Sequence, residues 1–236
     1  MDGILNVYKP AGITSYDVIR HIKRTMRRED LISLSKIGHA GTLDPFAEGV
    51  LLILLGKATK LSGQLMDMPK VYRGTIALGE ERDTDDLTGK VRKVSKVNKV
   101  IKVREDDFQR IAESFLGEIE QEPPVYSALH WGGKRLYELA RRGQMVQPLA
   151  RKVQVYEFKI IEPCSPFSLC SPSFSFEAKV GKGCYIRALA RDFGRALGTG
   201  AYLASLTRVS VGPYHCDDGL RLQDISKNLM ASVNYA

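Results

Sequence analysis

One acidic residue stands out because of the turn-forming residues around it. In GHAGTLDP, residues 38–45, Asp44 follows two glycines and precedes Pro45, and an apolar run over residues 50–55 comes next. Pro45 disfavours the helical conformation at Asp44, and glycines let a backbone approach a ligand closely. An ionised carboxylate in such a turn can act as a covalent nucleophile at a sugar carbon. The same pattern is typical of an ordinary Asp-Pro turn, so both interpretations stand on these residues alone.

Other residue types that could do chemistry give weaker signals. His39, which we expect in the same glycine-rich loop, could be a base, a ligand or a hydrogen-bonded side chain. The cysteines form no CxxC pair and have no histidine at metal-ligand spacing, so we expect reduced thiols and no metal; they are Cys164, Cys170, Cys184 and Cys216. Neither a pair of glycosidase-like carboxylates nor a GxSxG or Walker pattern is present.

The elements that must position Asp44 can be predicted from periodicity. Thr14 and Ser15 are suitable N-caps for an amphipathic helix whose apolar stripe is Val18, Ile19, Ile22 and Met26 and whose other faces are basic. Residues 70–79, KVYRGTIALG, alternate as a strand does, with Tyr72 near its start. Helical spacing also follows in residues 108–115, ahead of Gly117.

Arginines recur every four residues in YIRALARDFGRALG, which stacks them along one face of a predicted helix. Arg187 lies in the first turn, next to glycines, where a helix N-terminus can hold an anion. Arg191 and Arg195 are expected to form a solvated stripe, because unpaired arginines are mostly exposed.

Composition narrows the class of protein. The chain has 236 residues, a hydrophobic fraction of 44% and a formal net charge of +8. The length and hydrophobic fraction are typical of a globular protein. The charge is compatible both with a polyanionic partner such as nucleic acid and with a solvated basic surface that binds none, so both interpretations stand on composition alone. Its longest apolar run is far shorter than the ~20 residues of a membrane-spanning helix, and the N-terminus lacks a signal-peptide pattern. We therefore expect a cytoplasmic protein without membrane association.

Five blocks occur in this order: NVYKPAGITSYDVI, GHAGTLDPFAEGVLLILLGKATK, KVYRGTIALGEERDTDDLTG, PPVYSALHWGGKRLYELARRG and GKGCYIRALARDFGRALGTGAYLASLTRVSVG. Through them nearly the whole chain resembles the bacterial tRNA pseudouridine synthase B (TruB) family. The resemblance implies an α+β fold, the pseudouridine synthase fold, in which helices and loops flank a mixed, mostly antiparallel sheet. It implies a single catalytic domain over residues 1–236 with a thumb insertion at 120–148. The PUA domain found after this region in many family members is expected to be absent.

The resemblance also implies an activity, the isomerisation of the T-loop uridine at tRNA position 55 to pseudouridine. No cofactor or metal is needed, the base is flipped out of its stack, and the partner is the tRNA T arm, with no obligate protein partner. Asp44 is similar to the family nucleophile, Tyr72 to the tyrosine that stacks on the base, and Arg187 to the arginine that pairs with the carboxylate. The substrate-binding positions implied are His39, Lys9, Tyr185, Leu206 and Asp86.

One departure and three alternatives accompany this interpretation. His130 stands where a lysine is common in the thumb block. A basic RNA-binding or tRNA-folding module with weak catalysis could keep the same fold. A synthase of this fold could act on another RNA, and a carboxylate-dependent nucleosidase would release free base.

Overall fold

The computed structural model describes residues 2–26, 36–92, 105–144, 146–162, 173–225 and 233–234, so Cys164 and Cys170 lie outside the described residues. The chain forms two compact units, Met1–Arg73 with Leu206–Ala236, and Gly74–Ser205. Strands β4 (Lys70–Leu78) and β12 (Ala201–Val211) contribute residues to both. In the part of the chain that the structure describes, every helix is too short or too polar to cross a membrane.

The first unit combines short strands with one long helix. Its elements are β1 (Gly3–Lys9), α1 (Ser15–Thr25), β2 (Ile37–Ala40), β3 (Glu48–Leu55), the 3₁₀ helix η1 (Gly56–Leu61), α3 (Ser62–Asp67), β13 (Tyr214–His215), β14 (Leu220–Arg221), the 3₁₀ helix η2 (Leu222–Asp224) and β15 (Val233–Asn234). β3 is antiparallel to β1 and β2 and parallel to β12, whereas β1 is parallel to β14. These pairings make the sheet mixed, as predicted.

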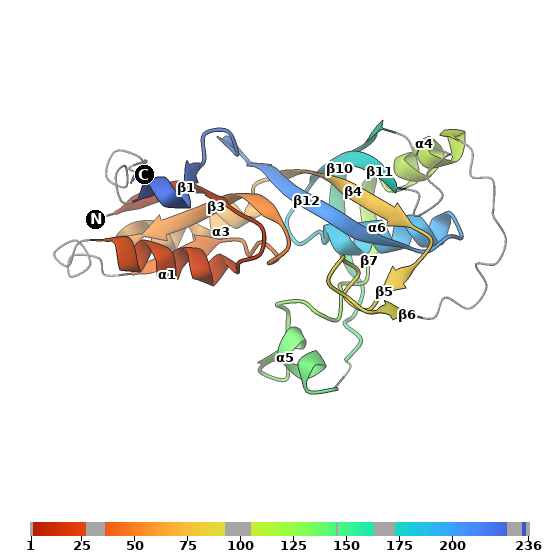
Figure 1. The fold of residues 1–236 in the computed structure, drawn as a ribbon, viewed down its shortest axis with the longest axis horizontal. Coiled ribbons are helices and arrows are strands. Elements are labelled where there is room, and N and C mark those ends of the chain that lie inside the picture. Colours follow the sequence, from red (N-terminus) through yellow and green to blue (C-terminus); the bar gives the residue numbers. More distant parts are fainter. Residues whose placement is uncertain are drawn as a thin grey trace. The chain divides into compact units, whose positions relative to one another are not determined.

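Strand β3 is buried almost throughout because both of its faces are covered. Leu51, Ile53 and Leu55 pack with the apolar stripe of α1, whereas Leu52 and Leu54 pack on the other side. This alternation follows from the two-residue repeat of a strand. Figure 1 shows α1 lying along β1 and β3. Thr14 is the N-cap of α1, and a capping box with Asp17 satisfies the first backbone N–H groups, which confirms the predicted helix start.

The second unit contains antiparallel strands and two longer helices. Its elements are β5 (Glu81–Arg82), β6 (Val91–Arg92), α4 (Glu105–Ser114), β7 (Gly117–Gln121), β8 (His130–Trp131), β9 (Lys134–Arg135), α5 (Leu136–Arg141), β10 (Arg151–Glu162), β11 (Ser173–Val180) and α6 (Ile186–Ala196). β10 is antiparallel to β11 and β7. Its core is a cluster of aromatic rings from α4, α6, β10 and β11: Phe108, Phe158, Phe174, Phe176 and Phe193.

The segment predicted as a thumb folds on itself inside this unit. The backbone N–H of Tyr137 donates to Ser127 O at 3.0 Å, and that of Leu136 donates to Leu129 O at 2.8 Å. Figure 1 shows the α5 segment standing apart from the long strands β10 and β11 of its own unit. His130 is exposed in the short β8–β9 hairpin.

Two local expectations were wrong. His39 lies in strand β2, where it pairs with Ile53 of β3, and not in a glycine-rich loop. The preceding glycine did not prevent pairing, because β3 supplies a long, fully buried partner. Arg191 is buried, with Asp85 beside it, and does not belong to a solvated stripe. Arg195 agrees with the expectation, since 47% of its side chain is exposed.

Candidate active site

The loop that carries Asp44 is held through its main chain on both sides of the acid. The hydroxyl of Ser15, the first residue of α1, donates to Leu43 O at 3.0 Å. The Ser15 Oγ atom also accepts from the backbone N–H of Leu43 at 2.9 Å. After Asp44, Pro45 O accepts from the backbone N–H of Gly12 at 2.8 Å. Asp44 is half-buried, and its own carbonyl accepts from the N–H of Ala47. These bonds fix the backbone direction from which the carboxylate extends.

Lys9 anchors the same loop from strand β1. Its side chain is fully buried, and its ammonium donates to Pro10 O and Ile13 O at 2.8 Å and to Pro45 O at 3.3 Å. Burial lowers the pKa of Lys9 to about 8, while the nearby charge of Asp44 acts in the opposite direction. Lys9, predicted as a substrate-binding residue, therefore lies within electrostatic reach of the predicted nucleophile.

Arg208 of β12 is a third anchor, and sequence reasoning missed it. It is 2% exposed, and its guanidinium donates to Val50 O at 2.7 Å and to Gly41 O at 3.1 Å, at the two ends of the loop. Gly49 makes this approach possible, because its φ is +105° and a Cβ there would lie 2.3 Å from Arg208 O. The only available signal was an arginine in a strand sequence without any other charged residue, LTRVSVG.

The remaining predicted residues of the first unit lie on strands. His39 is half-buried in β2, Tyr72 is buried near the start of β4, and Leu206 is buried in β12. Tyr72 occupies the strand position expected for it. The first unit thus contains Asp44, His39, Lys9, Tyr72 and Leu206.

In the second unit the structure brings Arg187 and Asp86 together. Arg187, in the first turn of α6, is 4% exposed, and its Nη1 lies 3.7 Å from Asp86 Oδ2. The guanidinium also donates to Thr84 O and Tyr126 O, both at 3.0 Å. Asp86 is held in turn by Thr88, whose N–H and hydroxyl donate to Oδ1 at 2.9 and 2.6 Å. Arg187 therefore joins the loop after β5 to the thumb.

One helical turn later, Arg191 makes a parallel set of contacts that the sequence did not reveal. Its Nη1 lies 3.1 Å from Asp85 Oδ2, and its Nη2 donates to Glu122 O at 2.9 Å. Burial raises the pKa of Asp85, and the Arg191 guanidinium opposes that shift. Asp85 has a φ of 61°, the one positive value at a residue other than glycine in the described ranges. Two arginines on one face of α6 thus hold both the 84–86 segment and the start of the thumb.

Tyr185 immediately precedes α6 and is fixed by Gln121 of β7. The side-chain amide of Gln121 accepts from Tyr185 N at 2.8 Å and donates to Tyr185 O at 3.1 Å. The guanidinium carbon of Arg151 lies 4.9 Å from the centre of the Tyr185 ring. Next to it, burial raises the pKa of the Cys184 thiol to about 12, so this cysteine is protonated at neutral pH.

The described part of the chain contains one group of side chains that could approach a metal. The potential ligand atoms of His215, Cys216 and Asp217 lie within 4.8 Å of one another, and Cys184 and Cys216 are free thiols. These three consecutive, partly exposed residues supply fewer than the four ligands of a structural zinc site, and His215 Nδ1 lies 3.2 Å from Asp217 Oδ2.

Two family models match consecutive parts of the chain. Residues 28–186 match the TruB family pseudouridylate synthase N-terminal domain, and residues 187–235 match the tRNA pseudouridylate synthase B C-terminal domain. A tRNA pseudouridine synthase B of Clostridium acetobutylicum is 42% identical over 227 residues, which make up 96% of this chain and 73% of that protein.

Solved structures with the same fold include a Cbf5-Nop10-Gar1 complex, with a TM-score of 0.69, 29% identity and 96% of this chain covered. Another is an H/ACA RNP bound to a substrate RNA containing 2′-deoxyuridine, with a TM-score of 0.65, 27% identity and 96% covered. The chain spans 54% and 53% of the length of these two solved chains, respectively.

Proposed function

Because the chain belongs to the TruB family of pseudouridylate synthases, which are isomerases, we propose that it converts the T-loop uridine at tRNA position 55 to pseudouridine. The name of the relative from Clostridium acetobutylicum supports tRNA as the RNA class. The net charge of +8 supports a polyanionic substrate. We further propose that the protein acts in the cytoplasm as one catalytic domain, without an obligate protein partner.

The reaction breaks the bond between N1 of uracil and C1′ of ribose and forms a bond between C5 and the same C1′. The proton leaves C5 and N1 gains one, so that nothing is consumed and no cofactor is required. We assign the nucleophile to Asp44. Its carboxylate can attack either the ribose C1′ or the uracil C6, and both routes give the same product.

The observation that carries this proposal is the fixed loop around Asp44. Backbone groups of Leu43 and Pro45, directly before and after the acid, are held by Ser15, Gly12 and Lys9. A preorganised carboxylate needs little reorganisation when the reaction begins. An ordinary Asp-Pro turn on a surface has no need of a buried lysine as an anchor, since turns usually satisfy their own backbone.

Reaching the target carbon requires the uridine to leave its stack, at a cost of a few kcal/mol. We propose that the Tyr72 ring stacks on the flipped base. We propose that Arg187 pairs with Asp44, and that Asp86 holds Arg187. His39, Lys9, Tyr185 and Leu206 are assigned to substrate binding. Each of these roles stays a prediction.

The test is incubation of the protein with an unmodified T-arm stem-loop, followed by mapping of pseudouridine and chromatography for free uracil. We expect pseudouridine at the T-loop uridine and no free base. Asp44→Asn keeps the shape of the side chain and should lower turnover by on the order of a thousandfold or more, with RNA binding retained. Asp218→Asn, at an exposed position, is the matched control and should behave as the unaltered protein.

Four outcomes would contradict the proposal, each in a different way. Release of uracil would indicate a nucleosidase. Modification only of an RNA with an unrelated loop would indicate another substrate. Tight RNA binding without any turnover would indicate a binding or folding module. An Asp44→Asn protein within tenfold of normal turnover would remove Asp44 as the nucleophile.

A further inference from the structure

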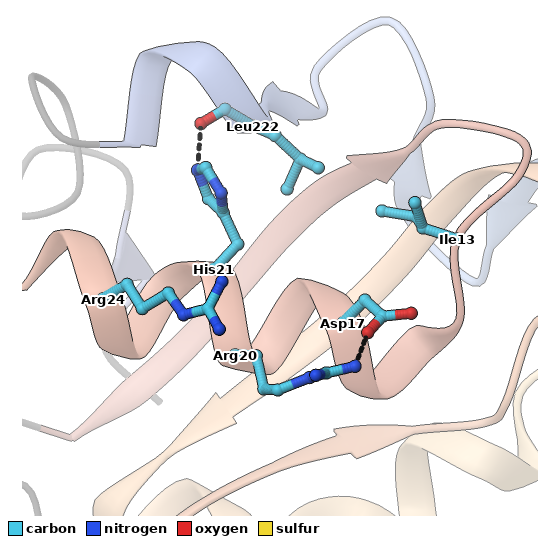
Figure 2. Close-up of a pocket in the computed structure, with 6 residues that line it drawn as sticks. All are labelled: Ile13, Asp17, Arg20, His21, Arg24 and Leu222. Carbon is cyan, nitrogen blue, oxygen red and sulfur yellow. Dashed lines mark hydrogen bonds and ion pairs between the residues drawn. The ribbon is translucent and has the colours of Figure 1, made fainter.

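The outer side of α1 contains a pocket that the proposed chemistry does not use. It has a volume of about 260 Å³, lies within the first unit and is lined by Ile13, Asp17, Arg20, His21, Arg24 and Leu222. Figure 2 shows its two arginines on the same helix as His21, with Leu222 across from them. The pocket therefore joins α1 to the segment that includes η2.

The far wall of this pocket is fixed by His21. Its Nε2 lies 3.0 Å from Leu222 O, and because a carbonyl oxygen can only accept, Nε2 carries the proton and donates. This bond ties the helix to a residue 201 positions later in the chain. The pocket is thus formed before any ligand enters it.

The basic side chains near the pocket differ in whether they form an ion pair. Arg20 pairs with Asp17, whose carboxylate also accepts from Thr14 as part of the helix cap. Lys23 and Arg24 are exposed, and within the described residues neither side chain has a hydrogen bond or an ion pair. As far as the described residues are concerned, these two side chains can meet an incoming anion without first breaking an ion pair.

Helix stabilisation explains only part of this arrangement. Lys23 and Arg24 lie in the last turn of α1, where cations interact favourably with the helix dipole. Arg20 lies outside that turn, and its guanidinium carbon is 5.8 Å from the ring centre of Tyr16, which is 60% exposed. An exposed tyrosine and two arginines at intervals of four residues form one row along the helix, about 6 Å apart at each step.

We propose that this row, Tyr16, Arg20 and Arg24, with Lys23 beside it, binds phosphodiester groups of the RNA substrate outside the nucleotide that reacts. We refer to these four residues as the α1 basic row. The guanidinium fork matches phosphate oxygens, and the partly buried Ile13 and Leu222 offer apolar contact to a sugar edge. This inference rests on the proposed RNA substrate.

The location of the row gives it a positioning role. Ser15 begins α1 and holds Leu43, next to Asp44, whereas Arg24 lies nine residues further along the helix. At 1.5 Å per residue that separation is about 14 Å, more than the size of one nucleotide. A strand whose phosphates lie on the row is held by the same rigid helix that holds the Asp44 loop. The row and the loop both belong to the first unit.

The test compares two double variants with the same change in charge. Arg20→Gln with Arg24→Gln removes both arginines of the row. Lys57→Gln with Lys60→Gln removes two exposed cations of η1 in the same unit and is the control. Affinity for the T-arm stem-loop is measured from 50 to 300 mM salt for both proteins and for the unaltered one. Thermal unfolding of each shows whether it is folded.

We expect the arginine variant to bind on the order of tenfold more weakly at about 100 mM salt. Its slope of log affinity against log salt should be shallower by about 1.4–1.8, since two phosphate contacts of 0.7–0.9 each are lost. The lysine control should keep both affinity and slope.

An arginine variant with unaltered affinity and slope would overturn the proposal, and so would equal losses in both variants. Poly-glutamate is the second ligand to be measured. If it binds the row as tightly as the RNA does, the site recognises acidic polymers in general and the RNA assignment is wrong. All of these are binding measurements, so they remain decisive even if the protein makes no pseudouridine.

Discussion

The hydroxyl of Ser15 both donates to and accepts from the backbone of Leu43, at 3.0 and 2.9 Å. One side chain thus satisfies both polar groups of the residue that precedes Asp44. Because Ser15 is also the first residue of α1, the direction of the Asp44 loop is set by a helix whose apolar stripe is buried. Such an attachment transmits the rigidity of the core to a loop.

Replacing this hydroxyl should loosen the loop. Ser15→Ala leaves the buried N–H and C=O of Leu43 without a partner, which should cost about 1–3 kcal/mol of unfolding free energy. Turnover should fall as well, since the backbone next to Asp44 loses its fixed direction. Chemical denaturation and initial rates measure both effects. Ser114→Ala is the control, because among the described residues that hydroxyl bonds only to Ile111 O of its own helix. An equal loss there would contradict the special role of Ser15.

Gly49 should not tolerate a side chain. A Cβ at this position would lie 2.3 Å from Arg208 O, and the φ of +105° is strained for any other residue. Gly49→Ala should therefore destabilise the protein by more than about 2 kcal/mol, from overpacking and backbone strain together. Gly63→Ala, in α3 with open space around it, should instead be neutral or stabilise by up to about 1 kcal/mol. Thermal unfolding of both variants separates these outcomes.

Lys9 should make stability depend on pH. Its pKa in the folded protein is about 8 against an ordinary value of 10.5, so above pH 8 the unfolded chain binds a proton that the folded chain has lost. The Lys9 contribution to the unfolding free energy therefore rises with pH, by about 1 kcal/mol between pH 8 and 9. The Cys184 thiol, whose pKa is raised to about 12 from an ordinary value of 9.0, contributes the opposite slope from about pH 8 upward and offsets part of this rise. Lys9→Met should flatten the rise between pH 8 and 9, and an unchanged slope would refute the shifted pKa.

The buried pair of Arg191 and Asp85 should matter more than the exposed pair of Arg195 and Glu81. Arg191→Met leaves Asp85 as an unpaired buried charge, which should cost about 3–5 kcal/mol. Arg195→Met should cost at most about 1 kcal/mol, because solvent screens that pair. Adding Asp85→Asn to Arg191→Met should recover part of the loss, because asparagine removes the charge and tolerates the φ of 61° at this position. Denaturant unfolding of all three proteins is the measurement, and equal effects of the two single variants would contradict the difference in burial.

Periodicity and family resemblance predicted much of the fold. The helix after Thr14, the strand with Tyr72 and the helix after Tyr185 were correct, because each has a clear repeat and local start signals. The resemblance to the family also predicted the mixed, mostly antiparallel sheet correctly. The strand of His39 was missed because its four residues become a strand only through pairing with β3, which is a tertiary effect.

The supports of the candidate site were harder to predict than its named residues. Arg208 and Arg191 are buried because carbonyl groups and Asp85 from distant segments satisfy their guanidinium groups. Sequence periodicity carries no information about such partners, so an arginine stripe was expected to be solvated. Gln121 was missed for the same reason, since its partner Tyr185 is 64 positions away.

The anchoring of the Asp44 loop by Arg208 has a consequence for biosynthesis. Arg208 bonds to Val50 and Gly41, which precede it by 158 and 167 residues. At a translation rate of about 5–20 residues per second, these two residues are synthesised roughly 8–33 s before their partner. Strand β3 and α1 can collapse together in that interval, but the loop acquires its last anchor only when most of the polypeptide has been made. In a nascent chain the Asp44 loop therefore lacks its Arg208 anchor. Chains that terminate before β12 are expected to have a loop that does not hold Asp44 in a fixed direction.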